Sequence, residues 1–374
     1  MAIYMKYTAI LENSLMQKDL LATAGSRMLE KFISPIDATV AVRLESAGVN
    51  IVGRANTSEF GVSGLFAMVQ KYEANSSILS NGAILTDSVS ANEQASRVAE
   101  GGADYRIGDY ENDAVTSIAD GVADFAFCND YTGAVSRAAA LHGVYYIHPT
   151  YGTVSRYGLI QSVSSMDQIG IVCKTPEDGF KALGIIKGYD PKDGIMSSDP
   201  PESTEPPELA EPTEPPEPPM SSQTQSYQAN LPPTMSFNPT AYSDVYKQVM
   251  QILCCAELSN NISRYDGIKI GHRAKDYNGL HELYTKSRTE AFGADVKLAA
   301  ILGAMILSHE NYMLYYNKAM QLRRLIKESL EFDKYDVIVT KCPLLSRLCG
   351  LPSLTTPEHT YIANAGCDRV LEEV

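Results

Sequence analysis

The sequence predicts an α/β protein, and two neighbouring segments carry that prediction. Residues 37–48 have the period of an amphipathic helix, with Val40 and Leu44 on one face. Asp37 is expected to cap the start of this helix. The apolar stretch at 49–57 then has the composition of a short buried strand. A helix that leads directly into a strand is typical of a layered α/β fold.

A Pro/Glu-rich segment divides the chain into two regions. Residues 199–219 contain nine prolines and seven acids. Proline removes backbone donors and like charges repel, so this stretch is expected to form an extended, disordered linker. A Ser/Gln-rich stretch continues it, which places the predicted linker at 196–237. A docking site for a domain that binds Pro-rich motifs is the alternative to a plain spacer.

The region after the linker, 238–374, is predicted to be mostly helical. Its longest helix is expected at 309–331, where apolar residues form one stripe. The members of this stripe are Tyr312, Tyr315, Tyr316, Ala319, Leu322, Ile326 and Leu330. Residues 335–340 have the composition of a strand.

The composition narrows the class of protein. With 44% hydrophobic and 20% charged residues, the 374-residue chain is typical of a soluble globular protein. Its net charge of −14 argues against direct binding to nucleic acid. Seven scattered cysteines without a Cys-x-x-Cys pair favour a reducing cytoplasm and no metal site. We expect no signal peptide, no membrane span and no cofactor.

Four blocks of the sequence stand out, at 34–62, 148–179, 256–273 and 284–297. The second block contains the stretch HPTYGTVSRYGLIQSVSS. Together these blocks resemble the amidase signature family, and within it the A subunits of glutamyl-tRNA(Gln) and aspartyl-tRNA(Asn) amidotransferases. The resemblance implies an α/β/α sandwich around a mixed sheet, truncated here, with 1–195 and 238–374 as two parts of one domain.

The resemblance also implies a Ser–Ser–Lys relay, in which a buried neutral lysine, a bridging serine and an attacking serine cooperate. Lys18, followed by Asp19, is the candidate for a remnant of the lysine, and a plain surface lysine is the alternative. The position of the bridging serine falls on Tyr110, which lies between two acids.

The stretch 128–137, CNDYTGAVSR, matches the loop that carries the nucleophile in the family. Without gaps the nucleophile position is Ala134, and with a one-residue shift it is Val135; neither side chain can attack. Ser136 is a displaced candidate, and Cys128 at the loop entrance is another. The residues whose backbone N–H groups would hold an oxyanion are Tyr131, Thr132 and Gly133.

The side of the site that would hold substrate also departs from the family pattern. Glutamine-using relatives have a basic pair after the Phe-Gly-x-x-Val-Lys segment, and here those positions are Leu298 and Ala299. His148, Asp167 and Gln168 are expected to be structural, the last two through buried hydrogen bonds that hold loops.

Two hypotheses about function follow. The first is a catalytically inactive homologue that acts as an interaction or regulatory subunit, with amidotransferase B/C-like subunits or an active paralogue as partner. The alternative is an active glutaminase or small-amide hydrolase that supplies ammonia for tRNA-dependent transamidation through a displaced nucleophile. Glutamine or a small amide is a ligand only in the second case.

Overall fold

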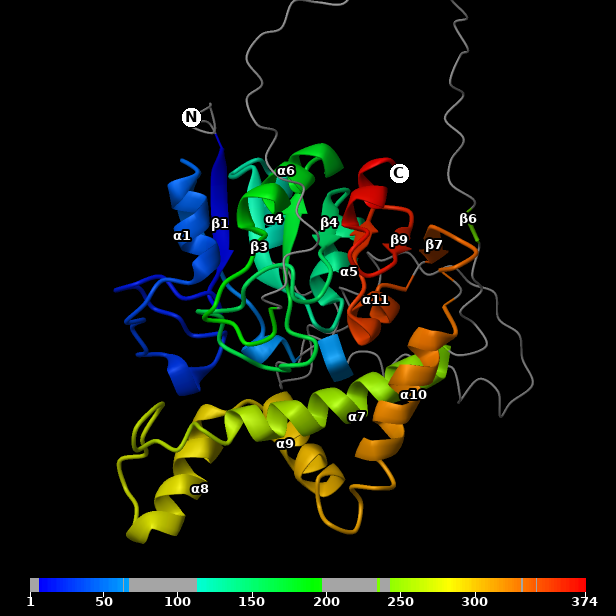
Figure 1. Cartoon of the computed structure of the whole chain (residues 1–374). Coiled ribbons are helices and arrows are strands. Elements are labelled where there is room, and N and C mark those ends of the chain that lie inside the picture. The colour runs from blue at the N-terminus through cyan, green and yellow to red at the C-terminus, as the bar shows by residue number, and fades with distance from the viewer. Residues whose placement is uncertain are drawn as a thin grey trace, which may run out of the picture.

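A mixed β-sheet forms the centre of the molecule (Figure 1). The computed structural model describes residues 7–62, 64–66, 113–196, 234–235, 243–330, 332–340 and 342–374. In this part of the chain the strand order is β2-β1-β3-β5-β4-β8-β9-β7-β6. The strands are β1 (Thr8–Glu12), β2 (Asn50–Ala55), β3 (Phe125–Asn129), β4 (Tyr145–His148), β5 (Ile169–Cys173), β6 (Thr234–Met235), β7 (Val337–Thr340), β8 (Ser353–Thr355) and β9 (Thr360–Ala363).

Three neighbouring strands at one side of the sheet run parallel. Strand β1 pairs in parallel with both β2 and β3, with Glu12 opposite Ala55 and Leu11 opposite Phe127. The pairs from β3 through β7 are antiparallel. Carboxyl ends of parallel strands meet at the same edge of a sheet. The segments that follow Glu12, Ala55 and Asn129 are therefore brought together at that edge.

Helices cover both faces of the sheet. Val40 of α1 and Phe180 of α6 belong to the same buried cluster as Leu11. Val115 of α4 belongs to a second cluster, with Ile10. Neighbouring residues of β1 thus point into opposite layers, as the two-residue period of a strand requires. The predicted α/β/α sandwich is confirmed. The helices of these layers are α1 (Thr39–Ser46), α4 (Asp113–Ala119), α5 (Ala134–Leu141) and α6 (Pro176–Ile186).

A group of helices lies below the sheet in the view of Figure 1. Helix α7 runs through the middle of this group, and its Leu253 and Leu258 are fully buried in the largest cluster. No described helix is both long enough and apolar enough to span a bilayer. Further helices along the chain are α7 (Ser243–Ile262), α8 (Gly279–Ala291), α9 (Ala294–Ile306), α10 (Tyr316–Glu328) and α11 (Leu344–Cys349). Short 3-10 turns occupy Arg27–Leu29, Glu59–Gly61 and Asp368–Glu372.

The predicted longest helix, at 309–331, is wrong in its bounds. Helix α10 has 13 residues, whereas α7 has 20. Residues 308–315 form turns, in which the Asn311 side chain donates to the Ser308 hydroxyl. Local side-chain bonds of this kind compete with helix formation. The buried members of the predicted stripe are Ala319, Ile326 and Leu330.

Two predicted elements are confirmed, and one predicted cap is wrong. Helix α1 lies within the predicted 37–48, and strand β7 lies within 335–340. Asp37 does not cap α1, because its carboxylate accepts the backbone N–H of Lys18 instead. Ala38 precedes the helix and supplies no side-chain cap.

Strand β2 is confirmed as a strand but is not buried along its length. It stands at the end of the strand order, and its residues are mostly exposed or half-buried. The Pro/Glu-rich stretch 199–219 lies outside the described residues. At the end of the predicted linker range, Thr234–Met235 pair with β7.

We expect Gly303→Ala to destabilise the protein by about 1–3 kcal/mol, measured by urea denaturation. A Cβ at this position of α9 would overlap the Cys255 carbonyl oxygen of α7, where the two helices cross. Gly184→Ala in α6 is the matched control, since no atom lies within 4 Å of its added methyl group. The control is expected to be neutral or stabilising by about 0.5–1 kcal/mol. Equal stability of the two variants would contradict the close crossing of α7 and α9.

Candidate functional site

The loop between β3 and α5 is the centre of the candidate site. Strand β3 ends at Asn129, and α5 begins at Ala134. Gly133 precedes the helix with φ of 69°, a left-handed conformation that glycine adopts without a steric penalty. The first helical residue is therefore Ala134, and its methyl group carries no nucleophilic atom. Val135, the position reached with a one-residue shift, is buried.

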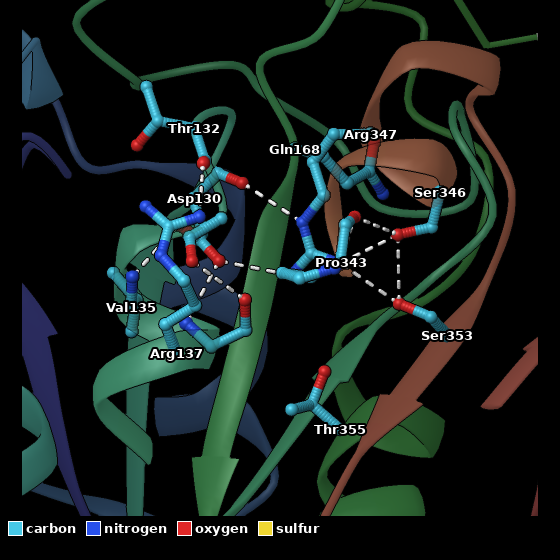
Figure 2. A network of polar contacts seen from close by, with 12 residues as sticks. Asp130, Thr132, Val135, Arg137, Gln168, Pro343, Ser346, Arg347, Ser353 and Thr355 are labelled. Carbon is cyan, nitrogen blue, oxygen red and sulfur yellow. Dashed lines mark hydrogen bonds and ion pairs between the residues drawn. The ribbon is translucent and has the colours of Figure 1, made fainter. Parts of the chain in front are cut away.

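Asp130 holds the first turn of α5. Its carboxylate accepts the backbone N–H groups of Val135 and Ser136, each at 3.0 Å. The Arg347 guanidinium donates to the same carboxylate at 3.0 Å, and both side chains are almost fully buried (Figure 2). The carboxylate thus satisfies N–H groups that a helix start leaves without partners inside the helix.

Arg347 comes from α11, 217 positions beyond Asp130 in the chain. Its Nη1 also donates to the Ser346 hydroxyl at 2.7 Å and to the Ser353 hydroxyl at 3.0 Å (Figure 2). A buried charge is costly unless it is paired and hydrogen-bonded, and this guanidinium is both. Arg347 therefore ties the start of α5 to the C-terminal part of the sheet.

Ser136, the displaced candidate nucleophile, is fully buried. Its hydroxyl donates to the Gly133 carbonyl oxygen at 3.1 Å, which is a bond within the first helical turn. Its backbone N–H is engaged by Asp130. The hydroxyl is thus turned into the helix that carries it.

Some backbone N–H groups of the loop are free to bind an acceptor. Within the described part of the chain, the N–H groups of Thr132, Gly133 and Ala134 donate no hydrogen bond. Tyr131 is held in place because its hydroxyl donates to the Phe60 carbonyl oxygen at 2.6 Å.

The backbone of Gly64 packs directly against this loop. A Cβ on Gly64 would lie 2.6 Å from the Thr132 hydroxyl and 2.9 Å from the Ala134 Cβ. The absence of a side chain at residue 64 therefore permits this close approach to the loop and to the first residue of α5.

Glu12, which no sequence pattern singles out, lies beneath the loop at the end of β1. It is only 3% exposed. Its carboxyl accepts the Ser14 hydroxyl at 2.7 Å and the Asn129 backbone N–H at 3.2 Å. The Thr57 hydroxyl is a further partner. One carboxyl therefore joins the segments that follow β1, β2 and β3.

Burial raises the pKa of Glu12 to about 7, and the nearby charge of Asp130 adds to this rise. The three hydrogen bonds oppose the rise, because they stabilise the ionised form. Burial also raises the pKa of Cys128 well above its ordinary value, so this thiol stays protonated at neutral pH. Cys128 therefore supplies no thiolate to the site.

The other two candidate residues do not lie in this cluster. Lys18 is exposed on a turn, and its backbone N–H donates to Asp37. The first strand ends six positions earlier, so it delivers the Glu12 carboxyl beneath the loop rather than the Lys18 ammonium group. Tyr110 falls outside the described residues.

The block after β4 supports the loops, as the hydrogen-bond roles predicted for it require. Asp167 is fully buried and accepts the Asn129 side-chain amide at 2.8 Å together with the backbone N–H of Ser162 at 2.9 Å. The Gln168 backbone N–H donates to the Asn129 side chain at 3.1 Å. His148 is buried, and burial lowers its pKa well below the ordinary value, so it is neutral.

No three His, Cys, Asp or Glu side chains come close enough to hold a metal ion in the described part of the chain. The candidate site therefore consists of a helix start with unpaired N–H groups, a buried ion pair and a buried carboxyl.

We expect Arg347→Met to lower the free energy of unfolding by about 3–5 kcal/mol, because it leaves the Asp130 charge buried without its partner. Thermal and urea denaturation measure this change. Combining it with Asp130→Asn is expected to cost less than the sum of the single changes. Arg324→Met, which breaks an exposed pair with Glu328, is the control and should have no measurable effect.

The Glu12 carboxyl makes stability depend on pH. Its pKa is about 7 in the folded protein, against 4.5 ordinarily, so the folded state keeps a proton that the unfolded chain releases. Its contribution is complete below pH 4.5 and is lost as the pH rises through about 7. The loss is about 3 kcal/mol, at about 1.4 kcal/mol per pKa unit.

Glu12→Gln is expected to flatten this part of the stability curve, measured by urea denaturation at several pH values. The exposed Glu45→Gln is the matched control and should keep the slope of the parent protein. A slope that survives in Glu12→Gln would assign the pH dependence to other groups.

Comparison with known proteins identifies relatives across most of the chain. The Amidase family model matches residues 12–65 and 115–358. The A subunit of glutamyl-tRNA(Gln) amidotransferase from Maridesulfovibrio salexigens is 33% identical over 359 residues, which cover 89% of this chain and 68% of that protein. The corresponding protein of a Janthinobacterium species is also 33% identical, over 93% of this chain and 70% of its own length.

Solved structures with this fold include amidases and an amidotransferase component. The native peptide amidase of Stenotrophomonas maltophilia has a TM-score of 0.63 at 19% identity, covering 98% of this chain and 80% of that one. The A subunit of glutamyl-tRNA(Gln) amidotransferase from Thermotoga maritima has a TM-score of 0.55 at 21% identity, covering 98% and 81%. The family match and the relatives above 30% identity lead to one conclusion: the chain belongs to the amidase signature family.

Proposed function

We propose that this chain is a catalytically inactive member of the amidase signature family, related to amidotransferase A subunits, that acts as an interaction or regulatory subunit. The single observation that carries the proposal is Ala134 at the first position of α5, where the family loop would present its nucleophile. A methyl group cannot form the acyl intermediate on which this class of chemistry depends.

The neighbouring hydroxyl does not replace the missing group. Ser136 lies two positions into the helix, is fully buried, and donates within its own turn. Moving it to the position of Ala134 would require α5 to shift or rewind, against the hydrogen bonds from Val135 and Ser136 to Asp130. A misplacement of about 1 Å already costs on the order of 100-fold in rate.

The base of the relay has no counterpart in the described cluster either. The buried group beneath the loop is the Glu12 carboxyl, and Lys18 is exposed. Of the two positions where relatives carry basic residues, Leu298 is partly exposed on α9 and Ala299 is buried. Neither side chain can pair with the carboxylate of glutamine.

The partner in this proposal is a B- or C-type amidotransferase subunit or an active paralogue. Two relatives at 33% identity are named as subunits of a larger enzyme, which supports a role in an assembly. The net charge of −14 disfavours direct contact with tRNA by this chain. We propose a cytoplasmic location and no cofactor.

The alternative is an active glutaminase or amide hydrolase that supplies ammonia through Ser136 or Cys128. The unpaired N–H groups of Thr132, Gly133 and Ala134 are the observation that favours it, because such groups can stabilise an oxyanion. The burial of both candidate nucleophiles weighs against it.

We expect the purified chain to show no labelling by a serine-directed fluorophosphonate probe and no ammonia release from glutamine above a heat-inactivated sample. The matched variants are Ser136→Ala and Cys128→Ser. Turnover that disappears in either variant would overturn the proposal, as would labelling that disappears in Ser136→Ala.

Purification of the tagged chain from its own cells should recover a B-type or C-type subunit or an active paralogue. Recovery of none of them would argue against the interaction role.

A further inference from the structure

Three parallel strands end around one buried carboxyl. Glu12 is the last residue of β1, Thr57 follows the end of β2, and Asn129 is the last residue of β3. The Ser14 hydroxyl and the Asn129 backbone N–H donate to Glu12 at 2.7 Å and 3.2 Å, and the Thr57 hydroxyl is the third partner. A change at this carboxyl therefore reaches three strand ends at once.

The space beside the Glu12 carboxyl is narrow, and no water-sized sphere fits into it. Water therefore has no room there to replace a protein partner that the carboxyl loses. The residues that line this gap with Glu12 are Ser14, Ala24, Thr57, Phe60, Gly61, Asn129 and Ser162.

Charged side chains near Glu12 act on it in opposite directions. Asp130, in the loop after β3, raises the pKa of Glu12. Arg54, in β2, interacts with it favourably, and its Nε and Nη2 are buried without a hydrogen-bond partner in the described part of the chain. The titratable groups that also feel the Glu12 charge are Cys128, Tyr131 and Tyr146, and burial raises the pKa of each well above its ordinary value, so they stay neutral.

We propose that Glu12 is a proton-operated switch that sets the position of the loop 130–133 through its hydrogen bond with Asn129. The ionised carboxyl accepts from all three donors. When the carboxyl takes a proton from solvent, it becomes neutral and one of its oxygens becomes a donor. The Ser14 and Thr57 hydroxyls can rotate and accept from that oxygen, whereas the Asn129 backbone N–H can only donate. The bond from Asn129 is therefore the one that weakens, and it leads directly into Asp130 and the loop.

The consequence is local to the start of α5. Asn129 is also held through its side chain, which donates to Asp167 and accepts from Gln168. Its backbone N–H is thus the part that responds to Glu12, while its side chain stays anchored. The backbone N–H groups of Thr132, Gly133 and Ala134 follow within five residues. This switch is independent of whether the chain hydrolyses any amide.

The sequence allows one amide to be observed alone. Cys128–Asn129 is the only Cys-Asn pair in the chain, so carbonyl-¹³C cysteine with ¹⁵N asparagine marks a single amide in the full-length protein. We expect the ¹⁵N chemical shift of Asn129 to titrate with a midpoint near pH 7. The ¹³C carboxyl signal of Glu12, in a glutamate-labelled sample, should have the same midpoint.

Glu12→Gln is expected to abolish the titration of Asn129. Glu59→Gln is the matched control, since Glu59 is a half-buried carboxyl that likewise accepts a serine hydroxyl and a backbone N–H, from Ser26 and Gly293. This control should leave the Asn129 midpoint unchanged. An Asn129 signal that does not titrate within about one unit of pH 7 would overturn the proposal, as would a titration that persists in Glu12→Gln. If Glu12→Gln does not fold, unequal midpoints for Glu12 and Asn129 in the parent protein would likewise overturn it.

Discussion

The buried ion pair between Asp130 and Arg347 is the contact on which the candidate site depends. Moving two charges out of water costs several kcal/mol per ion, and attraction between them offsets this only with good geometry and full hydrogen bonding. Here Asp130 accepts two backbone N–H groups in addition to the guanidinium, and Arg347 donates to two serine hydroxyls. The start of α5 is therefore fixed by two residues that lie 217 positions apart in the chain.

Elements that are set by neighbouring residues could be predicted from the sequence, whereas contacts between distant parts of the chain could not. The α1–β2 unit and β7 rest on local pattern, since apolar period and strand composition lie within a few neighbouring residues. The limits of α10 depend on a local competition, in which Asn311 bonds to Ser308 and turns replace the helix. The burial of Arg347 depends on β4 pairing with β8, which places Ser353 opposite His148. No local pattern contains that pairing.

In the candidate site, too, some residues could be predicted from a local motif and others only from the pairing of the strands. The position of Ala134 follows from the match of one contiguous loop, and the left-handed Gly133 before it can be expected from the same stretch. Glu12 could not be predicted as a buried group, because a single acid at the end of a short strand has the appearance of a strand end in solvent. Only the parallel pairing of β1 with β2 and β3 closes that end and buries the carboxyl. Lys18 is suggested by its dipeptide, yet the strand that would bury a side chain ends at Glu12.

The charges beneath the loop bear on what the unpaired N–H groups can do. The start of a helix carries partial positive charge that attracts anions. In this chain Asp130 already occupies the first turn of α5, and Arg347 is committed to Asp130. An oxyanion on the N–H groups of the loop would add a second negative charge beside the Asp130 carboxylate. The contacts of Asp130 hold the junction between β3 and α5, and this arrangement supports the proposed loss of hydrolysis.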